Sequence, residues 1–363
     1  MSKPIHKPFL ASIVVLVVGG LFIFASASLG LLARDGATFT SVAFNQIVFG
    51  IIGGSIACII TSRVPYRRWR PYSFYIFIIA IALNILVLIP GVGVSHGGAT
   101  RWLDVAGVSF QPAEFLKIAF ILYFAAWLSG VKSKIEDIRF GMIPTIVIIG
   151  IVGGLLLAQP DTDTFFIIAL SGMAMYIVSG ARWRDIAVFV LIGCIGLGAI
   201  AITRPYVMNR ITTFINPSHD PQGAGYQVQQ SLIAIGSGGL LGRGFGQSVQ
   251  KFNYLPEPIG DSIYAVAGEE FGLLGSAGII CLFLFFTLTG LTIAKGAKDA
   301  FGRLIVVGIV ILVSSGSFMN IASMLGLIPL GGIPLSFISH GGTALFFSLA
   351  EVGLIMNISR DIV

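Results

Sequence analysis

The sequence has little charge and little cysteine. Charged residues make up 10% of its 363 residues, against roughly 25% in typical soluble domains, and 56% are hydrophobic. With a mean hydropathy of +0.95, the chain is predicted to be a polytopic membrane protein rather than a soluble one. Its three cysteines, Cys58, Cys194 and Cys281, lie inside apolar runs without metal-ligand spacing, so we expect neither disulfides nor a zinc site.

The sequence also lacks room for a separate soluble domain. It consists almost wholly of apolar runs of about 15 to 30 residues, close to the roughly 20 that cross a bilayer. We therefore expect one all-α transmembrane domain, residues 1–363, with about ten spans. The predicted spans are residues 9–32, 40–61, 72–92, 113–128, 142–159, 164–179, 186–203, 262–294, 304–325 and 337–358. The first run follows Lys3 and Lys7 and has no convincing cleavage site, which indicates a retained signal anchor.

Lysine and arginine are unevenly distributed between the two predicted membrane faces. With the N-terminus inside, all but seven of the 22 fall on the cytoplasmic side, as the positive-inside rule requires. Both termini are therefore predicted to be cytoplasmic. This bias accounts for the net charge of +6. Because the chain has no basic groove with interleaved aromatic residues, we expect no nucleic-acid partner.

The one long polar stretch contains a large predicted extracytoplasmic loop, residues 204–261, between the seventh and eighth spans. Its cationic and aromatic side chains suit a sugar-pyrophosphate head group, because rings pack against sugars and guanidinium groups match phosphate oxygens. Ordinary anchoring at the membrane interface would explain the same residues.

This loop ends in LPEPIGDSIYAVAGEE, which places Asp261, Glu269 and Glu270 at the start of an apolar helix. Carboxylates at the edge of a bilayer carry a desolvation cost that usually accompanies a function. Helix capping alone would also explain Asp261. Glu269 and Glu270 would lie about 12 to 14 Å deeper in a continuous helix and would need partners or a wet cavity. The counter-charges available from the outer side are Arg210, Lys117 and Arg101.

Three further polar motifs are predicted to face the outer side. In RWLDVAGVSFQPAEFLK, residues 101–117, Glu114 and Lys117 share a helix face and can pair. The pair would either lock two helices or present Lys117 to a phosphate. In QPDTDT, residues 159–164, Asp163 is predicted to cap the next helix, whereas Asp161 either caps it or faces an outer cavity. The irregular segment LGGIPLSFISHGG, residues 330–342, is predicted to form a re-entrant turn.

Several ordered motifs resemble one family. They are LDVAGVSFQPAEFLK, QPD, GYQVQQSLIAIGSGGLLGRGFGQSVQKFNYLPE, the aspartate at 261 followed by AVAGEEFGLLG, and PLSFISHGGTA. These motifs resemble the SEDS family (shape, elongation, division and sporulation), which includes FtsW, RodA and SpoVE and whose members are peptidoglycan glycosyltransferases. The resemblance covers nearly the whole chain. GQSVQKFNYLPE looks more like the division branch, FtsW, than the elongation branch, RodA.

The resemblance implies a ten-span protein of the bacterial cytoplasmic (inner) membrane that polymerises lipid II, the undecaprenyl-pyrophosphate-linked disaccharide pentapeptide, on the outer face at the division septum. Asp261 matches the family's essential aspartate. It would act as general base on the acceptor hydroxyl, or hold a divalent cation, magnesium or manganese, that helps the pyrophosphate leave. No other cofactor is expected. The residues expected to bind substrate are Arg101, Glu114, Lys117, Asp161, Arg210, Glu257, Ser339, Gly341 and Gly342. The expected protein partners are a class B penicillin-binding protein, which is a transpeptidase, and division-machinery membrane proteins.

Three sites depart from the family pattern. Ile259 and Gly260 replace a usual His-Thr pair before Asp261. Asp163 stands where glycine is usual, and His340 stands where tyrosine is usual. The departures leave a member of low activity, or a scaffold for division, as an alternative.

Two other functions are also compatible with the sequence. An elongation-branch polymerase would need the same fold. A lipid II flippase or transporter would explain the intramembrane carboxylates Glu269, Glu270 and Glu351, although no internal repeat is evident and its absence counts against this reading.

Overall fold

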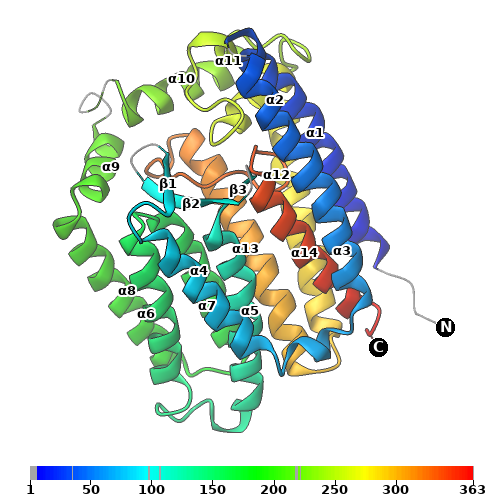
Figure 1. The fold of residues 1–363 in the computed structure, drawn as a ribbon, viewed down its shortest axis with the longest axis vertical. Helices are drawn as coiled ribbons and strands as arrows, with labels where there is room; N and C mark the ends of the chain where they lie inside the picture. The colour runs from blue at the N-terminus through cyan, green and yellow to red at the C-terminus, as the bar shows by residue number, and fades with distance from the viewer. Residues whose placement is uncertain are drawn as a thin grey trace.

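Apolar helices make up most of the protein. The computed structural model describes residues 6–34, 36–96, 99–105, 108–216, 220 and 222–362, and its helices gather in one bundle (Figure 1). Within these ranges, seven helical segments are long and apolar enough to cross a membrane, and three shorter apolar helices accompany them. Together they coincide with the ten predicted segments, so the polytopic helical fold is confirmed. Lys3 lies outside the described residues.

The elements follow one another from the N-terminus to the C-terminus. The first half contains α1 (Lys7–Arg34), α2 (Gly36–Phe44), the π-helix η1 (Asn45–Gly53), α3 (Gly54–Arg63), the 3-10 helix η2 (Tyr66–Trp69), α4 (Ser73–Val87), β1 (Gly93–His96), β2 (Ala99–Val105), β3 (Val108–Phe110), α5 (Pro112–Gly130), the 3-10 helix η3 (Lys132–Lys134), α6 (Met142–Ala158) and α7 (Thr162–Val178). The second half contains α8 (Trp183–Thr203), α9 (Pro205–Ile215), α10 (Ala224–Ser237), α11 (Gln250–Asn253), α12 (Ile263–Gly296), α13 (Ala300–Met324) and α14 (Gly342–Ser359).

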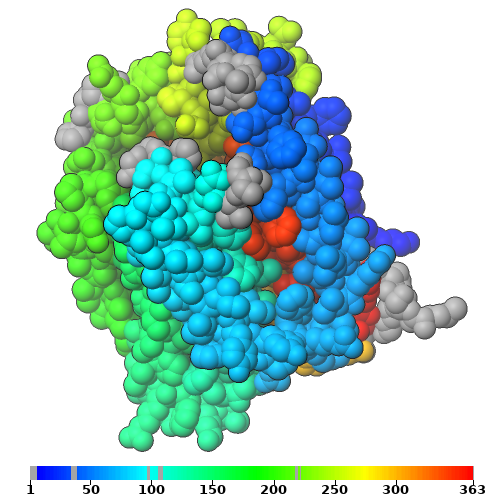
Figure 2. Space-filling model, in the orientation of Figure 1, coloured from blue at the N-terminus to red at the C-terminus, as the bar shows by residue number. Residues whose placement is uncertain are grey.

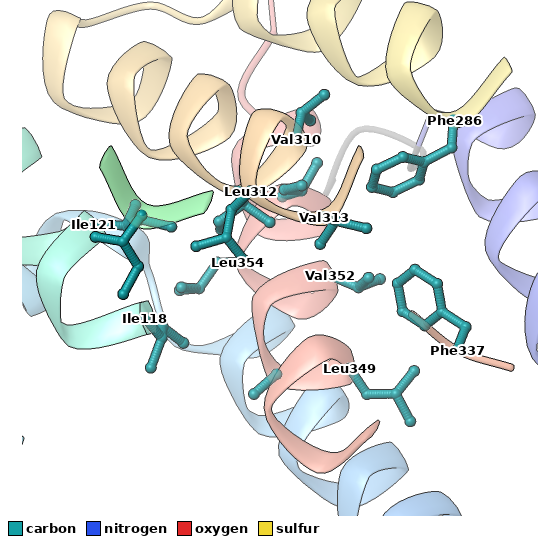
Figure 3. Packing of buried hydrophobic residues seen from close by; sticks show 14 of the residues in the cluster. Ile118, Ile121, Phe286, Val310, Leu312, Val313, Phe337, Leu349, Val352 and Leu354 are labelled. Atoms are coloured by element: carbon teal, nitrogen blue, oxygen red, sulfur yellow. The ribbon is translucent and has the colours of Figure 1, made fainter. Parts of the chain in front are cut away.

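Helix α13 lies at the centre of the core. Most of its side chains are buried, and Figure 3 shows some of them against side chains of neighbouring helices. The labelled residues include Val310, Leu312 and Val313 of α13, Ile118 and Ile121 of α5, and Leu349, Val352 and Leu354 of α14. Helix α8 is the opposite case, because Asp185 is its one buried residue and it lies at the edge of the bundle in Figure 1. A helix with such exposed apolar side chains is suited to contact lipid.

The last part of the second span packs closely against the last span. A Cβ atom added at Gly54 would lie 2.8 Å from Cδ1 of Leu349 and 3.1 Å from Cα of Phe346. Glycine therefore lets α3 approach α14, as small residues do in membrane bundles. In the space-filling view, atoms of α14, in red, are visible beside the blue atoms of this second span (Figure 2).

A three-stranded antiparallel sheet, in the order β1-β2-β3, lies against α4 and α5. Leu103 in the middle strand pairs with Gly93 on one side and with Phe110 on the other. The sequence analysis did not predict this sheet. It matters for function because its middle strand carries Arg101.

The described residues nearest to the two termini lie at the same end of the bundle. The main-chain N–H of His6 donates to Oγ of Ser359 at 3.5 Å, which brings the start of the first span beside the end of the last one. This arrangement agrees with the predicted common side of the termini. The assignment of that side to the cytoplasm stays a prediction from the charge bias. The end of the bundle opposite to His6 and Ser359 is the predicted outer end.

Helix α12 reverses direction near its start. Gly272 has φ 65° and ψ −162°, which breaks the helix, and only glycine adopts such a conformation readily. The hydroxyl of Tyr264 donates to the carbonyl oxygen of Ser276 at 3.5 Å, although twelve residues of continuous helix would rise about 18 Å. Residues 263–271 therefore fold back beside the long second part. The prediction that Glu269 and Glu270 lie deeper than Asp261 along one continuous helix is wrong.

The glycine-rich loop of residues 237–249 fills the gap in the hydrogen bonds of α12. The N–H of Leu273 donates to the carbonyl of Gly239 at 2.9 Å, and the N–H of Arg243 donates to the carbonyl of Glu269 at 3.0 Å. Two more bonds repeat this pattern one residue further along each segment. The loop and the reversed helix thus satisfy each other's main-chain groups, as irregular backbone inside a membrane protein requires.

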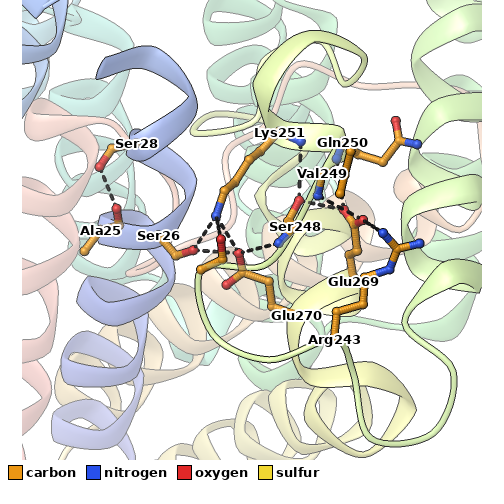
Figure 4. A network of polar contacts seen from close by, with 11 residues as sticks. Ala25, Ser26, Ser28, Arg243, Ser248, Val249, Gln250, Lys251, Glu269 and Glu270 are labelled. Atoms are coloured by element: carbon orange, nitrogen blue, oxygen red, sulfur yellow. Dashed lines mark hydrogen bonds and ion pairs between the residues drawn. The ribbon is translucent and has the colours of Figure 1, made fainter. Parts of the chain in front are cut away.

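Ion pairs fasten the same loop to the bundle (Figure 4). Lys251 and Glu270 are both fully buried, with Nζ 2.7 Å from Oε1, and that oxygen also accepts from the hydroxyl of Ser26 at 2.6 Å. Glu269 is 3.2 Å from Nη1 of Arg243. The partners of the two glutamates therefore come from the loop, α11 and α1. This pairing corrects the expectation that the counter-charges are Arg210, Lys117 and Arg101.

Candidate active site at the outer end of the bundle

Connections that are far apart in the sequence meet near Asp261. Arg101 of β2 donates from Nε to the carbonyl of Gln159 at 3.3 Å and from Nη2 to the carbonyl of Pro160. Its Nη1 lies 3.7 Å from Oδ1 of Asp161. The sheet is thereby tied to the turn between α6 and α7. Two of the connections that are predicted to face the outer side therefore lie in contact.

Asp161 is the residue that caps α7. Its side chain accepts from the N–H of Thr164 at 3.4 Å. Burial raises the pKa of Asp161, although the charge of Arg101 acts in the opposite direction. The prediction that Asp163 is the cap is therefore wrong.

Asp163 instead faces the cluster around Asp261. Its Oδ2 lies 2.7 Å from Nη1 of Arg210 and accepts from the N–H of Gly332 at 3.0 Å. A Cβ atom added at Gly332 would lie 3.8 Å from Oδ2 of Asp261 and 4.0 Å from Nη1 of Arg101. The carboxylates of Asp163 and Asp261 and the guanidinium groups of Arg101 and Arg210 thus gather around Gly332. These four side chains form the cluster that is the candidate active site.

Asp261 is half-buried within this cluster. Burial raises the pKa of Asp261 to about 7, and the negative charges of Glu257 and Asp163 act in the same direction. The guanidinium groups of Arg210 and Arg101 oppose them. A carboxyl group with a pKa near neutrality suits proton transfer at neutral pH.

The main chain of Asp261 is held from two neighbouring segments. The side-chain amide of Asn320 in α13 donates to the carbonyl of Asp261 and to the carbonyl of Ile333, both at 2.8 Å. The hydroxyl of Ser339 donates to the carbonyl of Gly260 at 2.8 Å. The N-cap of α12 is the next residue, Ser262, so helix capping does not account for Asp261.

The segment before α14 is anchored in turn by the second span. Gln46 of η1 donates to the carbonyl of Ser339 at 3.3 Å and accepts from the N–H of Gly341 at 3.0 Å. A Cβ atom at Gly342 would lie 2.6 Å from a carbonyl oxygen of η1. Ser339, Gly341 and Gly342 therefore hold the loop in place, and their contact with substrate stays a prediction.

His340 also contributes to holding this segment. Its N–H donates to the carbonyl of Ile259 at 2.7 Å, and its ring stacks on Phe24 of α1 with 6.1 Å between ring centroids. The residue therefore packs against α1 and supports the turn that leads to Asp261.

Glu257 lies in the turn before Asp261 and has φ 45°. A left-handed conformation is uncommon for residues other than glycine and is often found at functional sites. The carbonyl of Glu257 accepts from the N–H of Ser262 at 3.1 Å, which closes the turn. Its side chain is exposed, and its contact with substrate stays a prediction.

The predicted pair on α5 is confirmed. Nζ of Lys117 lies 2.6 Å from Oε2 of Glu114, and both side chains are almost buried. They line a cavity of about 30 Å³ together with Ser339, which is room for about one water molecule. Glu351 of α14 is buried and interacts electrostatically with both. A contact between Lys117 and a phosphate of the substrate stays a prediction.

Arg210 connects the cluster with an apolar groove. The groove has a volume of about 120 Å³ and lies between α9, α10 and residues 326–330. Its lining includes Phe214, Val228, Leu232 and Leu330. The guanidinium group of Arg210 thus lies between an apolar surface and the carboxylate of Asp163.

The described residues offer few ligands for a metal ion. Among them, no group of three or more His, Cys, Asp or Glu side chains is arranged to hold one. The site therefore does not resemble a zinc centre built from protein ligands alone. It fits only a cation such as Mg²⁺ that takes its other ligands from substrate phosphates and water.

The sequence analysis missed Gln46 and Asn320 as site-building residues. Both are almost fully buried within apolar helices, where an amide side chain needs partners. That polarity was the available signal. It could not reveal the partners, because those are main-chain carbonyls of distant loops.

Fold and site together define a polytopic membrane protein with a cluster of carboxylates and arginines at the outer end of its helices. The family model described as a cell cycle protein, FtsW/RodA/SpoVE, matches residues 7–362. The chain belongs to the FtsW/RodA/SpoVE family.

Curated relatives agree with this assignment. Stage V sporulation protein E of Bacillus subtilis is 41% identical over 318 residues, which cover 87% of this chain and 86% of that protein. A probable peptidoglycan glycosyltransferase FtsW of Trichlorobacter lovleyi is 35% identical, with 100% of this chain and 97% of that protein covered. A probable peptidoglycan glycosyltransferase FtsW of Coxiella burnetii is 34% identical, with 94% and 92% covered.

Solved structures share the fold. One matching chain comes from a solved structure described as "Structural coordination of polymerization and crosslinking by a peptidoglycan synthase complex". It superposes with a TM-score of 0.80 at 21% identity, and the match covers 99% of this chain and 98% of that one. The rod shape determining protein RodA of Thermus thermophilus superposes with a TM-score of 0.71 at 23% identity, covering 99% and 97%.

Proposed function

We propose that this protein is a peptidoglycan glycosyltransferase that polymerises lipid II into glycan strands at the outer face of the cytoplasmic membrane. The observation that carries the proposal is the half-buried carboxyl of Asp261, with a pKa near 7, in a cluster that contains Arg101 and Arg210. The names of relatives that cover nearly the whole chain support the same activity.

In the proposed reaction, a hydroxyl oxygen of the acceptor sugar attacks the anomeric carbon of the donor sugar. A new carbon–oxygen bond forms while the bond from that carbon to the pyrophosphate breaks, and the pyrophosphate keeps the electron pair. Asp261 accepts the proton of the attacking hydroxyl as general base. Arg101 and Arg210 stabilise the negative charge on the departing pyrophosphate, since guanidinium groups match phosphate oxygens.

In an alternative role, Asp261 would hold a divalent cation instead of acting as general base. Asp261 would supply one carboxylate ligand, and the pyrophosphate and water would supply the rest, as is common for Mg²⁺. Such a cation would add positive charge where the leaving group develops negative charge. The remaining side chains of the cluster would act in the same way with or without it.

We also propose that the protein works in septal wall synthesis with a class B penicillin-binding protein and other division proteins of the membrane. The FtsW names of several relatives favour division over elongation. The synthase complex whose chain shares this fold is described as coordinating polymerization and crosslinking, which favours a transpeptidase partner.

The transporter alternative has less support. Two of the three carboxylates that motivated it, Glu269 and Glu270, are engaged in ion pairs with Arg243 and Lys251. Side chains committed to such pairs are less suited to a transport path than free ones.

The experiment combines the purified protein and its partner with fluorescent lipid II. We expect glycan chains from the wild type and from Glu136→Gln, a control in an exposed ion pair with Arg182. Asp261→Asn should abolish the polymer while leaving the melting temperature near that of the wild type. Equal polymer from Asp261→Asn would remove the proposed role of this residue. Lipid II translocation in liposomes without any polymer would favour the transporter.

A further inference from the structure

The carboxylate of Asp163 binds two hydrogen-bond donors near Asp261, the guanidinium group of Arg210 and the main-chain N–H of Gly332. Its Oδ2 is 2.7 Å from Nη1 of Arg210 and accepts the N–H of Gly332 at 3.0 Å. A guanidinium group and a main-chain N–H are also the donors that bind phosphate oxygens in proteins. The side chain of Asp163 therefore uses donors that a phosphate group of a ligand could use.

The location of this carboxylate matches the expected place of the leaving group. The main-chain N–H of Gly332 donates to Asp163, and a Cβ atom added at Gly332 would lie 3.8 Å from Oδ2 of Asp261 and 4.0 Å from Nη1 of Arg101. Arg210 reaches the cluster from the apolar groove of about 120 Å³. A ligand with an apolar chain in the groove would place an attached phosphate at Arg210, next to the general base.

Helix stability does not require Asp163 at this position. Asp161 already caps α7, so the first turn has its acceptor. The pair with Arg210 is also partly accessible, with 30% of the arginine side chain and 16% of the aspartate side chain exposed. Because solvent reaches the pair and screens its charges, the carboxylate and the guanidinium group attract each other less than they would in a dry site.

We propose that Asp163 is an internal placeholder for one phosphate of the substrate and leaves Arg210 and Gly332 when the substrate binds. The proposal rests on the proposed function in taking the pyrophosphate of the lipid-linked donor as the displacing group. Asp163 then sets the affinity of the site. Its negative charge must be moved away from Arg210 before a phosphate can bind, and a like charge beside the phosphate lowers affinity.

The alternative is that Asp163 only ties α7 to the segment of residues 330–332. The two roles predict opposite effects of removing the charge. A tie that is lost would loosen the site and weaken anion binding. A placeholder that is lost would free Arg210 and strengthen it.

The test measures binding of inorganic pyrophosphate to the full-length protein in detergent micelles by calorimetry. Asp163→Asn keeps the size of the side chain and removes its charge, and Asp163→Gly removes the side chain altogether. We expect the Kd of both variants to fall about tenfold relative to the wild type, because a competing carboxylate is gone. Glu136→Gln, which removes the carboxylate of the exposed pair with Arg182, serves as the matched control and should leave Kd unchanged.

A double variant makes the assignment specific. Adding Arg210→Gln to Asp163→Asn should cancel the gain in affinity, because the freed guanidinium is its source. An unchanged or raised Kd in both Asp163 variants, with melting temperatures like that of the wild type, would overturn the proposal, and so would an absence of pyrophosphate binding in all variants.

The outcome is separable from that of the proposed function. Polymer formation by the wild type without any effect of Asp163 on pyrophosphate affinity would reject the placeholder and keep the polymerase. Tighter pyrophosphate binding by the Asp163 variants, without polymer from the wild type, would keep the anion site and reject the polymerase.

Discussion

The side-chain amide of Asn320 donates to the main-chain carbonyl of Asp261 at 2.8 Å. The same nitrogen donates to the carbonyl of Ile333 at 2.8 Å. One buried side chain of α13 thus fixes the distance between the proposed general base and the loop that carries Gly332. The position of the reactive carboxyl therefore depends on Asn320, whose amide nitrogen is used by two main-chain carbonyls.

Replacing Asn320 by alanine should lower kcat much more than it changes KM. The carbonyls of Asp261 and Ile333 would lose their donor, at a cost of about 1–3 kcal/mol for the buried carbonyl of Ile333 if it stays unsatisfied. A shift of about 1 Å in a reacting group can lower the rate by about 100-fold. Steady-state polymerisation kinetics and thermal unfolding would measure both effects.

The control for this prediction is Ser314→Ala, also in α13, which removes a hydrogen bond to Thr287 away from the site. It should change stability without a selective effect on kcat. A fall in activity of Asn320→Ala that only follows the loss of folded protein, with kcat per folded molecule unchanged, would refute a positioning role.

Much of the fold was predictable because apolar runs of membrane length rarely have another structure. The Glu114–Lys117 pair was also predictable, since three residues of helix bring two side chains to one face. The reversal at Gly272 was missed because residues 262–294 read as a single apolar run. Its length was a signal: the 34 residues of α12 would extend about 51 Å, well beyond a hydrocarbon layer of about 30 Å.

The candidate site was only partly predictable for a different reason. Sequence position showed that Asp261, Arg101 and Arg210 belong to outer connections. It could not show that Asp161, rather than Asp163, caps α7, because both lie at the start of the same helix and either can cap it. That choice depends on Arg210, which lies 47 residues further along the chain.

The buried pair of Lys251 and Glu270 gives the next prediction, which concerns stability. Both side chains are 0% exposed, so Lys251→Met would leave a charge buried without its partner. Breaking such a pair typically costs about 3–5 kcal/mol. We expect a large fall in melting temperature for the protein in detergent.

Restoring charge balance should reverse part of this loss. The double variant Lys251→Met with Glu270→Gln removes both charges and should be more stable than Lys251→Met alone. Arg182→Gln, in the exposed pair with Glu136, should have little effect. A melting temperature for Lys251→Met as high as that of Arg182→Gln would show that the buried pair does not hold the loop.

The pH dependence of the reaction should report the charge of Asp261. Burial holds its pKa at about 7, above the ordinary value of 3.8. The carboxyl is therefore mostly neutral below about pH 7, and a general base must be ionised. We expect kcat/KM to rise as the pH increases through about 7 and then to level off.

The neighbouring charges decide where this rise occurs. Glu257→Gln removes a negative charge that raises the pKa of Asp261, so the rise should move to lower pH. Arg101→Gln removes a positive charge that lowers the pKa, so the rise should move to higher pH. The profile of Glu136→Gln should match that of the wild type, because its ion pair with Arg182 is exposed and not part of the site. Shifts in the same direction for Glu257→Gln and Arg101→Gln would mean that another group controls the rate, since opposite charges must move the pKa of one carboxyl in opposite directions.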